Sequence, residues 1–204
     1  MSSKVQNIVC CLDLEGVLVP EMWLGVAAKT GLKELELTTR EEPNYDKLMR
    51  FRLGVLKKHR IRLSDIQSVI AKMSPLPGAK SFLDKLRANY QVIILSDTFS
   101  EFAQPLMKQL GWPTIFCHTL SVDSKGFVTD YHLRISDQKR KAVKALQNLN
   151  FYVQAAGDSY NDLTMLLSAD KGILFRTTDK IKKEYPKLPA VNDYSKLLKH
   201  FEVK

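Results

Sequence analysis

The chain has 204 residues, 45% of them apolar and 26% charged, which excludes a disordered or low-complexity protein and fits one globular domain, with or without an inserted subdomain. Its formal net charge is +9, but the basic runs at 57–62, 138–141 and 180–187 accompany no nucleic-acid-binding motif. We interpret these runs as solvated helix faces and expect no nucleic-acid partner.

The cysteines and the apolar runs indicate the compartment. The three cysteines form no CxxC pair, and no apolar run approaches the roughly 18 residues of a membrane span. The start of the chain also lacks the basic segment and long apolar segment of a secretory signal. We therefore expect a cytoplasmic protein with reduced thiols and no membrane partner.

Short apolar runs bounded by polar or turn residues are typical of buried strands. Five such runs cover residues 7–13, 91–97, 114–118, 152–158 and 172–175. Segments with helical periodicity lie between most of these runs, at 79–90, 101–111 and 139–149. Parallel strands need crossover connections, so this alternation predicts an α/β fold with a Rossmann-like parallel sheet as its core.

A long insertion follows the first predicted strand. About 55 residues precede Pro75, and they contain amphipathic stretches at 21–31 and 44–59 but no convincing strand. A connection of this length after a strand predicts a helical cap over the strand ends. We expect a cap subdomain at 20–74, inserted into a core domain formed by residues 1–19 and 75–204.

A second interruption follows the third predicted strand. Residues 119–134 alternate in polarity around a turn at 123–126, which contains Gly126. This pattern predicts a small β-hairpin with a loop of several residues.

Acidic residues close three of the predicted strands, at Asp13, Asp97 and Asp158. In an open α/β sheet, ligands bind beyond the carboxyl ends of the strands, so these acids are expected to share one crevice. Glu15 follows Asp13, and Asn161 and Asp162 follow Asp158. Carboxylates this close need a counter-charge, and an oxygen-rich set of ligands favours Mg²⁺.

The hydroxyl of Ser96 and the amine of Lys139, near a predicted helix start, complete a set suited to phosphoryl transfer. A carboxylate can attack phosphorus and form an acyl phosphate, and the acid two residues on can protonate the departing alkoxide. Two other classes also fit these strand-end residues: a receiver-like signalling phosphoacceptor and a non-catalytic basic binding module. A receiver would carry no helical insertion of this size after the first acid.

Four segments in this order resemble the motifs of the haloacid dehalogenase superfamily. They are DLEG at 13–16, Ser96 within ILSDT at 94–98, Lys139, and GDSYND at 157–162. The chain is most similar to the branch of phosphoserine phosphatases that also act as homoserine phosphotransferases, in DLEGVLVPE, ILSDTF and AAGDSYND. The resemblance implies a Mg²⁺-dependent phosphatase, with phosphoserine as substrate and homoserine as a possible acceptor. A phosphatase of another small phosphate monoester remains the alternative.

The resemblance implies roles for the core residues. Asp13 is the expected nucleophile and a Mg²⁺ ligand, Glu15 is the acid/base and ligates Mg²⁺ through its backbone carbonyl, and Asp158 is a further ligand. Substrate contacts are expected from Ser96, Asp97, Lys139 and Asn161, with Asp162 supporting the metal. Asp97 stands where these phosphatases usually carry glycine, and Glu15 where they usually carry aspartate.

The resemblance also implies two substrate contacts from the cap. Glu21 is expected to meet the substrate ammonium and Arg52 its carboxylate, because a guanidinium can bind a carboxylate through two hydrogen bonds. Arg50 lies two residues before Arg52 and is the alternative for this second contact.

Overall fold

A computed structural model describes residues 7–38, 41–42 and 44–202. Its centre is a seven-stranded sheet in the order β4-β3-β2-β1-β5-β6-β7, in which every neighbouring pair is parallel except β3 and β4. The strands are β1 (Ile8–Leu12), β2 (Gln91–Phe99), β3 (Thr114–Val122), β4 (Val128–His132), β5 (Tyr152–Gly157), β6 (Lys171–Phe175) and β7 (Ala190–Val191). The predicted α/β fold is confirmed.

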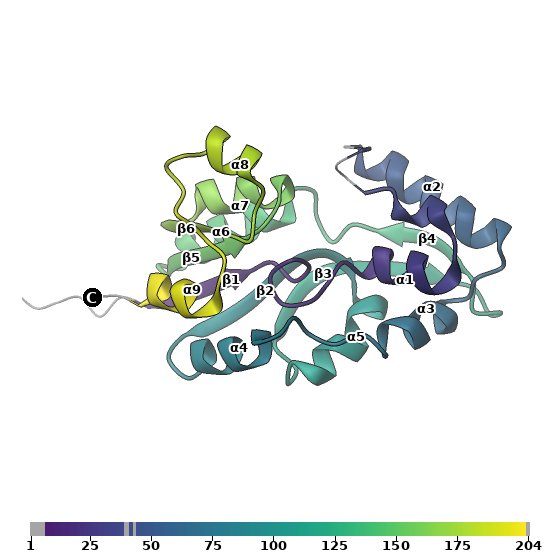
Figure 1. The fold of residues 1–204 in the computed structure, drawn as a ribbon, viewed down its shortest axis with the longest axis horizontal. Coiled ribbons are helices and arrows are strands. Elements are labelled where there is room, and N and C mark those ends of the chain that lie inside the picture. The colour runs from purple at the N-terminus through teal and green to yellow at the C-terminus, as the bar shows by residue number, and fades with distance from the viewer. Residues whose placement is uncertain (1–6, 39–40, 43, 203–204) are drawn as a thin grey trace, which may run out of the picture.

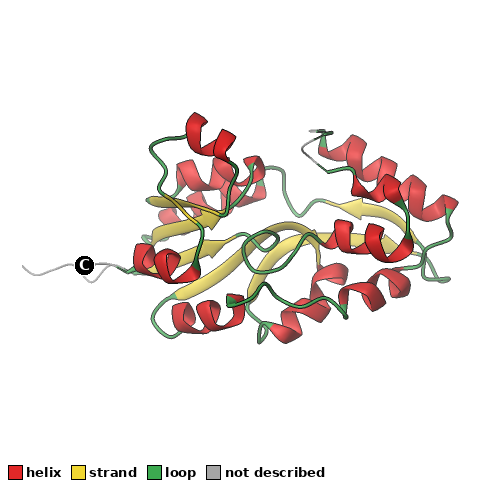
Figure 2. Ribbon diagram, in the orientation of Figure 1, coloured by secondary structure: helices red, strands yellow, loops and turns green. Residues whose placement is uncertain are grey.

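Helices cover both faces of this sheet (Figures 1 and 2). The core helices are α4 (Ala79–Arg87), α5 (Ser100–Gln109), α6 (Gln138–Asn148), α7 (Leu163–Ser168), α8 (Asp179–Glu184) and α9 (Tyr194–Phe201), with a 3₁₀ turn η2 (Tyr160–Asp162). Cys10 and Leu12 belong to the apolar cluster that includes α4, α5 and α9, whereas Val9 and Cys11 belong to the cluster that includes α6 and α7. Alternate residues of β1 therefore pack on opposite faces, as in a doubly covered strand.

The strand order reverses at β1. The chain runs from β1 through β2 to β3 on one side and returns to β5, β6 and β7 on the other. The carboxyl ends of β1 and β5 therefore lie at a topological switch point, where open α/β sheets bind their ligands.

Residues between β1 and α4 form α1 (Met22–Thr30), the 3₁₀ turn η1 (Lys33–Glu36), α2 (Tyr45–Lys58) and α3 (Leu63–Ile70). The helix α2 begins at an Asn44 cap whose side chain accepts the Lys47 N–H at 3.0 Å. These helices lie beside the hairpin end of the sheet (Figure 1). Among the described residues, no helix is both long and apolar enough to cross a membrane.

The predicted hairpin is present, but it is not separate from the third strand. The first half of β3 pairs in parallel with β2, and the second half of β3 pairs antiparallel with β4. The hairpin also supports α2, because Arg50 of α2 forms an ion pair of 2.6 Å with Asp130 of β4. The Tyr131 hydroxyl donates to Asp46 of α2 at 2.5 Å.

Candidate active site

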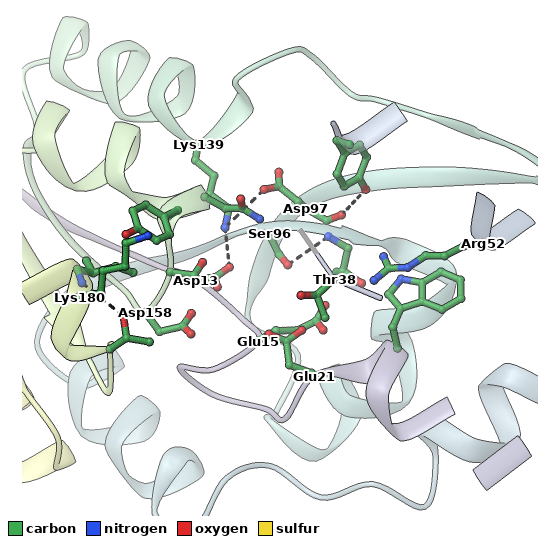
Figure 3. Close-up of a pocket in the computed structure, with 18 residues that line it drawn as sticks. Asp13, Glu15, Glu21, Thr38, Arg52, Ser96, Asp97, Lys139, Asp158 and Lys180 are labelled. Carbon is green, nitrogen blue, oxygen red and sulfur yellow. Dashed lines mark hydrogen bonds and ion pairs between the residues drawn. The ribbon is translucent and has the colours of Figure 1, made fainter. Parts of the chain in front are cut away.

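A pocket of about 610 Å³ lies between the carboxyl ends of the strands and the helices α1 and α2 (Figure 3). All predicted site residues line it except Asp162, which is completely buried. The strand ends and the loops and helices after them supply Asp13, Glu15, Ser96, Asp97, Lys139, Asp158 and Asn161, and the segment of α1 and α2 supplies Glu21 and Arg52. Segments up to 148 residues apart in the chain, from Asp13 to Asn161, thus meet at one site.

Asp13 is held in line with the neighbouring strand although β1 ends at Leu12. Its N–H donates to the Ala156 carbonyl of β5 at 2.9 Å, and its side chain is buried. The chain then turns sharply at Gly16, whose φ is +76° and whose N–H donates to the Val19 carbonyl at 2.8 Å. The turn brings Glu15 back into the same pocket as Asp13.

Lys139, the second residue of α6, is the buried cation at the centre of the acids. Its Nζ lies 2.8 Å from Asp13 Oδ1, 2.7 Å from Asp162 Oδ1 and 3.7 Å from Asp97 Oδ2. Burial acts to lower the pKa of Lys139, but these carboxylates outweigh it and raise that pKa well above its ordinary value. Lys139 therefore stays charged and can bind a further anion, such as a phosphoryl group.

Asp97 is held by donors from three core residues. Gln138 Nε2 donates to Asp97 Oδ1 at 3.2 Å and also to the Ser96 carbonyl, while His118 Nε2 lies 3.6 Å from Asp97 Oδ1. Burial acts to raise the pKa of Asp97, but Lys139, His118 and Gln138 outweigh it and hold that pKa below its ordinary range. The Asp97 carboxylate is therefore a fixed anion in the pocket wall.

Three carboxylates form a candidate metal centre. One oxygen from each of Asp13, Asp158 and Asp162 lies within 4.8 Å of the others. Both oxygens of Asp162 already accept hydrogen bonds, Oδ1 from Lys139 and Oδ2 from the N–H groups of Asp158 and Ser159 at 2.9 and 3.1 Å. Asp162 is thus suited to holding this loop in place, whereas Asp13 and Asp158 line the pocket and can present carboxylate oxygens to a metal there.

The donor set fits a hard divalent cation. All side-chain donors of the cluster are carboxylate oxygens, as Mg²⁺ prefers. A Cβ at Gly16 would lie 2.5 Å from the Asp158 carboxyl carbon, so only glycine leaves that carboxylate in its present position. The site therefore depends on the absence of a side chain at this turn.

Gly16→Ala should lower the affinity for Mg²⁺ by roughly 10- to 100-fold, because Asp158 must move and because alanine is strained at this positive φ. Calorimetric titration of Mg²⁺ into the folded variant measures this loss. Gly54→Ala is the matched control, since a Cβ at Gly54 meets nothing within 4 Å. Equal Mg²⁺ affinities for the two variants would contradict this account of the metal centre.

Glu15 and Glu21 lie side by side near the cap (Figure 3). Glu15 Oε2 accepts the Met22 N–H at 2.8 Å, which fixes the carboxyl group at the start of α1. Burial, followed by the charge of Glu21, raises the pKa of Glu15 to about 8. Glu15 therefore carries a proton at neutral pH and can act as a general acid.

Arg50 and Arg52 of α2 lie in different places. Arg52 is 6% exposed and lines the pocket, whereas Arg50 is outside it and pairs with Asp130. Arg52 Nη2 donates to the Leu37 carbonyl at 3.0 Å, and its guanidinium lies 4.6 Å from the centre of the Trp23 ring. Its buried Nε has no hydrogen-bond partner among the described residues, so Arg52 has a donor left for a ligand.

Sequence reasoning missed several residues of the site. Three of them support the Ser96–Asp97 segment: Tyr45, His118 and Gln138. Three others line the pocket: Thr178, Lys180 and Ile181. The position of Gln138, next to Lys139 at a predicted helix start, could have indicated that it belongs to the site. Tyr45 and His118 belong to no motif, and only the packing of cap on core brings them to the site.

The comparisons with known proteins agree with the predicted family. The family profile of haloacid dehalogenase-like hydrolases matches residues 9–170. A protein of Pseudomonas aeruginosa named phosphoserine phosphatase ThrH is 53% identical over 193 residues, which cover 95% of this chain and 94% of that protein. A phosphoserine phosphatase of Pseudomonas syringae pv. tomato is also 53% identical, over 95% of this chain and 81% of its own length.

Solved structures share the fold at lower identity. A phosphoserine phosphatase from T. onnurineus superposes with a TM-score of 0.76 at 24% identity, covering 100% of this chain and 99% of that one. A phosphoserine phosphatase described as a phospho-aspartyl intermediate analogue superposes with a TM-score of 0.79 at 20% identity, covering 97% of this chain and 100% of that one. The match over most of its length shows that this chain belongs to the haloacid dehalogenase-like hydrolase family.

Proposed function

We propose that this enzyme hydrolyses phosphoserine through an aspartyl-phosphate intermediate on Asp13, and that homoserine can replace water as the acceptor. The predicted phosphoserine phosphatase activity agrees with the names of relatives that are 53% identical over 95% of the chain. The observation that carries the proposal is the pairing of Lys139 with Asp13 at the floor of a pocket that also contains Arg52. The end of the pocket at Lys139 suits a phosphate, and the end at Arg52 suits an amino-acid carboxylate.

The phosphate end of the substrate would lie over Asp13. Lys139 and the Ser96 hydroxyl would bind the phosphoryl oxygens, assisted by the Asp97 N–H and by Asn161 on the pocket wall. Mg²⁺ held by Asp13, the Glu15 carbonyl and Asp158 would neutralise charge on the phosphoryl group. The amino-acid end would lie in the cap, with its carboxylate on Arg52 and its ammonium near Glu21.

The reaction would then proceed in two displacements. Asp13 attacks phosphorus in line, the bond between phosphorus and the serine oxygen breaks, and protonated Glu15 gives its proton to that oxygen. Glu15 then removes a proton from water or from the homoserine hydroxyl, which attacks the aspartyl phosphate and restores Asp13. Water yields phosphate and homoserine yields phosphohomoserine.

The helical segment 20–74 is proposed to act as the cap of this site. It supplies Glu21 and Arg52 to the pocket, and the hairpin of β3 and β4 holds α2 from the other side. A receiver-like phosphoacceptor would carry no such helical insertion after its first acid. Membership of the hydrolase family favours the enzyme over both a receiver and a basic binding module.

Product analysis tests this function. The purified protein should release phosphate from phosphoserine with Mg²⁺ but not with excess chelator, and added homoserine should yield phosphohomoserine at the expense of phosphate. Threonine phosphate and an aromatic phosphate monoester serve as comparison substrates. Absence of Mg²⁺-dependent release from phosphoserine would reject the proposal, and release without phosphohomoserine would reject only the homoserine step.

Arg52→Ala should raise KM for phosphoserine by on the order of 10- to 100-fold, because it removes the cation proposed to bind the substrate carboxylate. Turnover of p-nitrophenyl phosphate, which has no carboxylate, should change little. Arg50→Ala is the matched control, since Arg50 lies two residues away and pairs with Asp130 outside the pocket. Similar losses for both substrates would remove Arg52 from the carboxylate site.

A further inference from the structure

Tyr45 joins the cap directly to the phosphate end of the pocket. It is the first residue of α2, it lines the pocket, and its hydroxyl donates to the Asp97 carbonyl of β2 at 2.9 Å. Burial, followed by the nearby Asp97 charge, raises the pKa of the Tyr45 phenol, so the hydroxyl remains a donor. The bond connects residues 52 positions apart in the chain.

The core end of this contact is rigidly held. Gln138 binds both the Ser96 carbonyl and the Asp97 side chain, and His118 lies beside the same carboxylate. His118 Nδ1 accepts the Arg134 N–H at 3.2 Å, so in the neutral ring the proton is on Nε2 and faces Asp97. The carbonyl that Tyr45 binds is therefore a fixed point next to Ser96.

The cap end is equally constrained. Arg52 lies seven positions after Tyr45 on the continuous helix α2, a rise of about 10 Å. Arg52 is then held by the Leu37 carbonyl and by the face of the Trp23 ring, which packs edge-on against Phe102 of α5 at 5.2 Å. A chain of fixed contacts thus runs from Ser96 through Tyr45 and α2 to Arg52.

We propose that Tyr45 is a positioning residue that sets the distance between the phosphate site at Ser96 and the carboxylate site at Arg52, and thereby excludes phosphorylated amino acids longer than phosphoserine and phosphohomoserine. The inference rests on the proposed function of these two sites. Tyr45 acts through α2 and not on the reacting atoms. Loss of its hydroxyl removes the tie between the start of α2 and the Ser96–Asp97 segment, and so relaxes the discrimination against longer phosphorylated amino acids.

Tyr45→Phe tests this role, since it removes one oxygen and leaves the ring that lies 6.2 Å from His118 and 5.9 Å from Tyr131. The ratio of kcat/KM for phosphoserine to that for O-phosphotyrosine, whose aromatic ring places the phosphate farther from the carboxylate, should fall about tenfold. Turnover of p-nitrophenyl phosphate, which reaches no cap residue through a carboxylate, should fall less than turnover of phosphoserine.

Tyr131→Phe is the matched control. Its hydroxyl also ties the cap to the core, through Asp46, but it does not bind the Ser96–Asp97 segment. The control should leave the ratio of the two substrates unchanged. An equal change in both variants would mean that any loosening of the cap alters selectivity, and would overturn the positioning role of Tyr45.

A double variant separates this inference from the proposed function. If Tyr45 acts through Arg52, then Tyr45→Phe combined with Arg52→Ala should cost no more on phosphoserine than Arg52→Ala alone. Additive losses would overturn the inference while leaving Arg52 as the carboxylate site. If Arg52→Ala kept full activity on phosphoserine, that result would instead count against the proposed function.

A substrate-independent measurement uses the two tryptophans, Trp23 in the pocket and Trp112 on the surface. With Trp112→Phe as background, fluorescence reports on Trp23 alone. Tyr45→Phe should increase quenching of Trp23 by acrylamide in the absence of substrate, and Tyr131→Phe should increase it less. Unchanged quenching in Tyr45→Phe would show that the hydroxyl does not hold this end of the cap, and would overturn the inference.

Discussion

Asp13→Asn should reduce turnover of phosphoserine by at least about 10⁴-fold while leaving the protein folded. An amide cannot form the acyl phosphate, so the first displacement has no nucleophile. The substitution nearly preserves shape, and its oxygen can still accept from Lys139, which now binds Asp13 Oδ1 at 2.8 Å. Lys139 keeps its contact of 2.7 Å with Asp162 in the variant, so the buried cation still has a charged partner.

Covalent labelling distinguishes loss of the nucleophile from loss of binding. Rapid quenching with ³²P-phosphoserine should trap an acid-stable label on the wild-type protein, located by peptide mapping at Asp13, and none on the variant. Asp84→Asn is the matched control, because Asp84 is an exposed partner of Lys80 and does not line the pocket. A label that persists in Asp13→Asn would assign the nucleophile to another carboxylate.

The core of the fold was predictable because its signals are local. Each parallel strand buried on both faces is a continuous apolar run, as in the predicted strands at 7–13 and 152–158, which form β1 and β5. The two-residue β7 has too few residues for such a signal. The continuity of β3 from the sheet into the hairpin was missed, because the change of pairing partner depends on β2 and β4 and not on β3 itself.

The acids of the site were predictable for a related reason. Strand ends are visible in the sequence, and the rules of parallel sheets bring the ends together, so Asp13, Asp97 and Asp158 could be assigned to one crevice. The choice between Arg50 and Arg52 needed the rotation of α2 about its axis, which follows from its packing on β4. The contact of Tyr45 with Asp97 likewise depends on cap placement and has no local signal.

Lys139→Met should have the second largest effect, and it should act on both activity and stability. It removes the only cation that the described structure places within hydrogen-bond distance of Asp13 and Asp162. Activity should fall on the order of 10³-fold, because a preorganised charge for the phosphoryl group is lost. The free energy of unfolding should fall by about 3–5 kcal/mol, because two buried carboxylates lose their partner.

Urea unfolding in the presence of chelator measures the stability loss, since no added cation then replaces Lys139. Lys141→Met is the matched control: it makes the same change two residues along α6, where the lysine is exposed and its amine donates to the Ser136 hydroxyl at 3.0 Å. Added Mg²⁺ should restore part of the stability of Lys139→Met but not its activity, because a cation near Asp13 offsets the repulsion without supplying the amine. Equal unfolding free energies for the two variants would mean that the carboxylates hold their positions by protonation alone, and that Lys139 serves only the substrate.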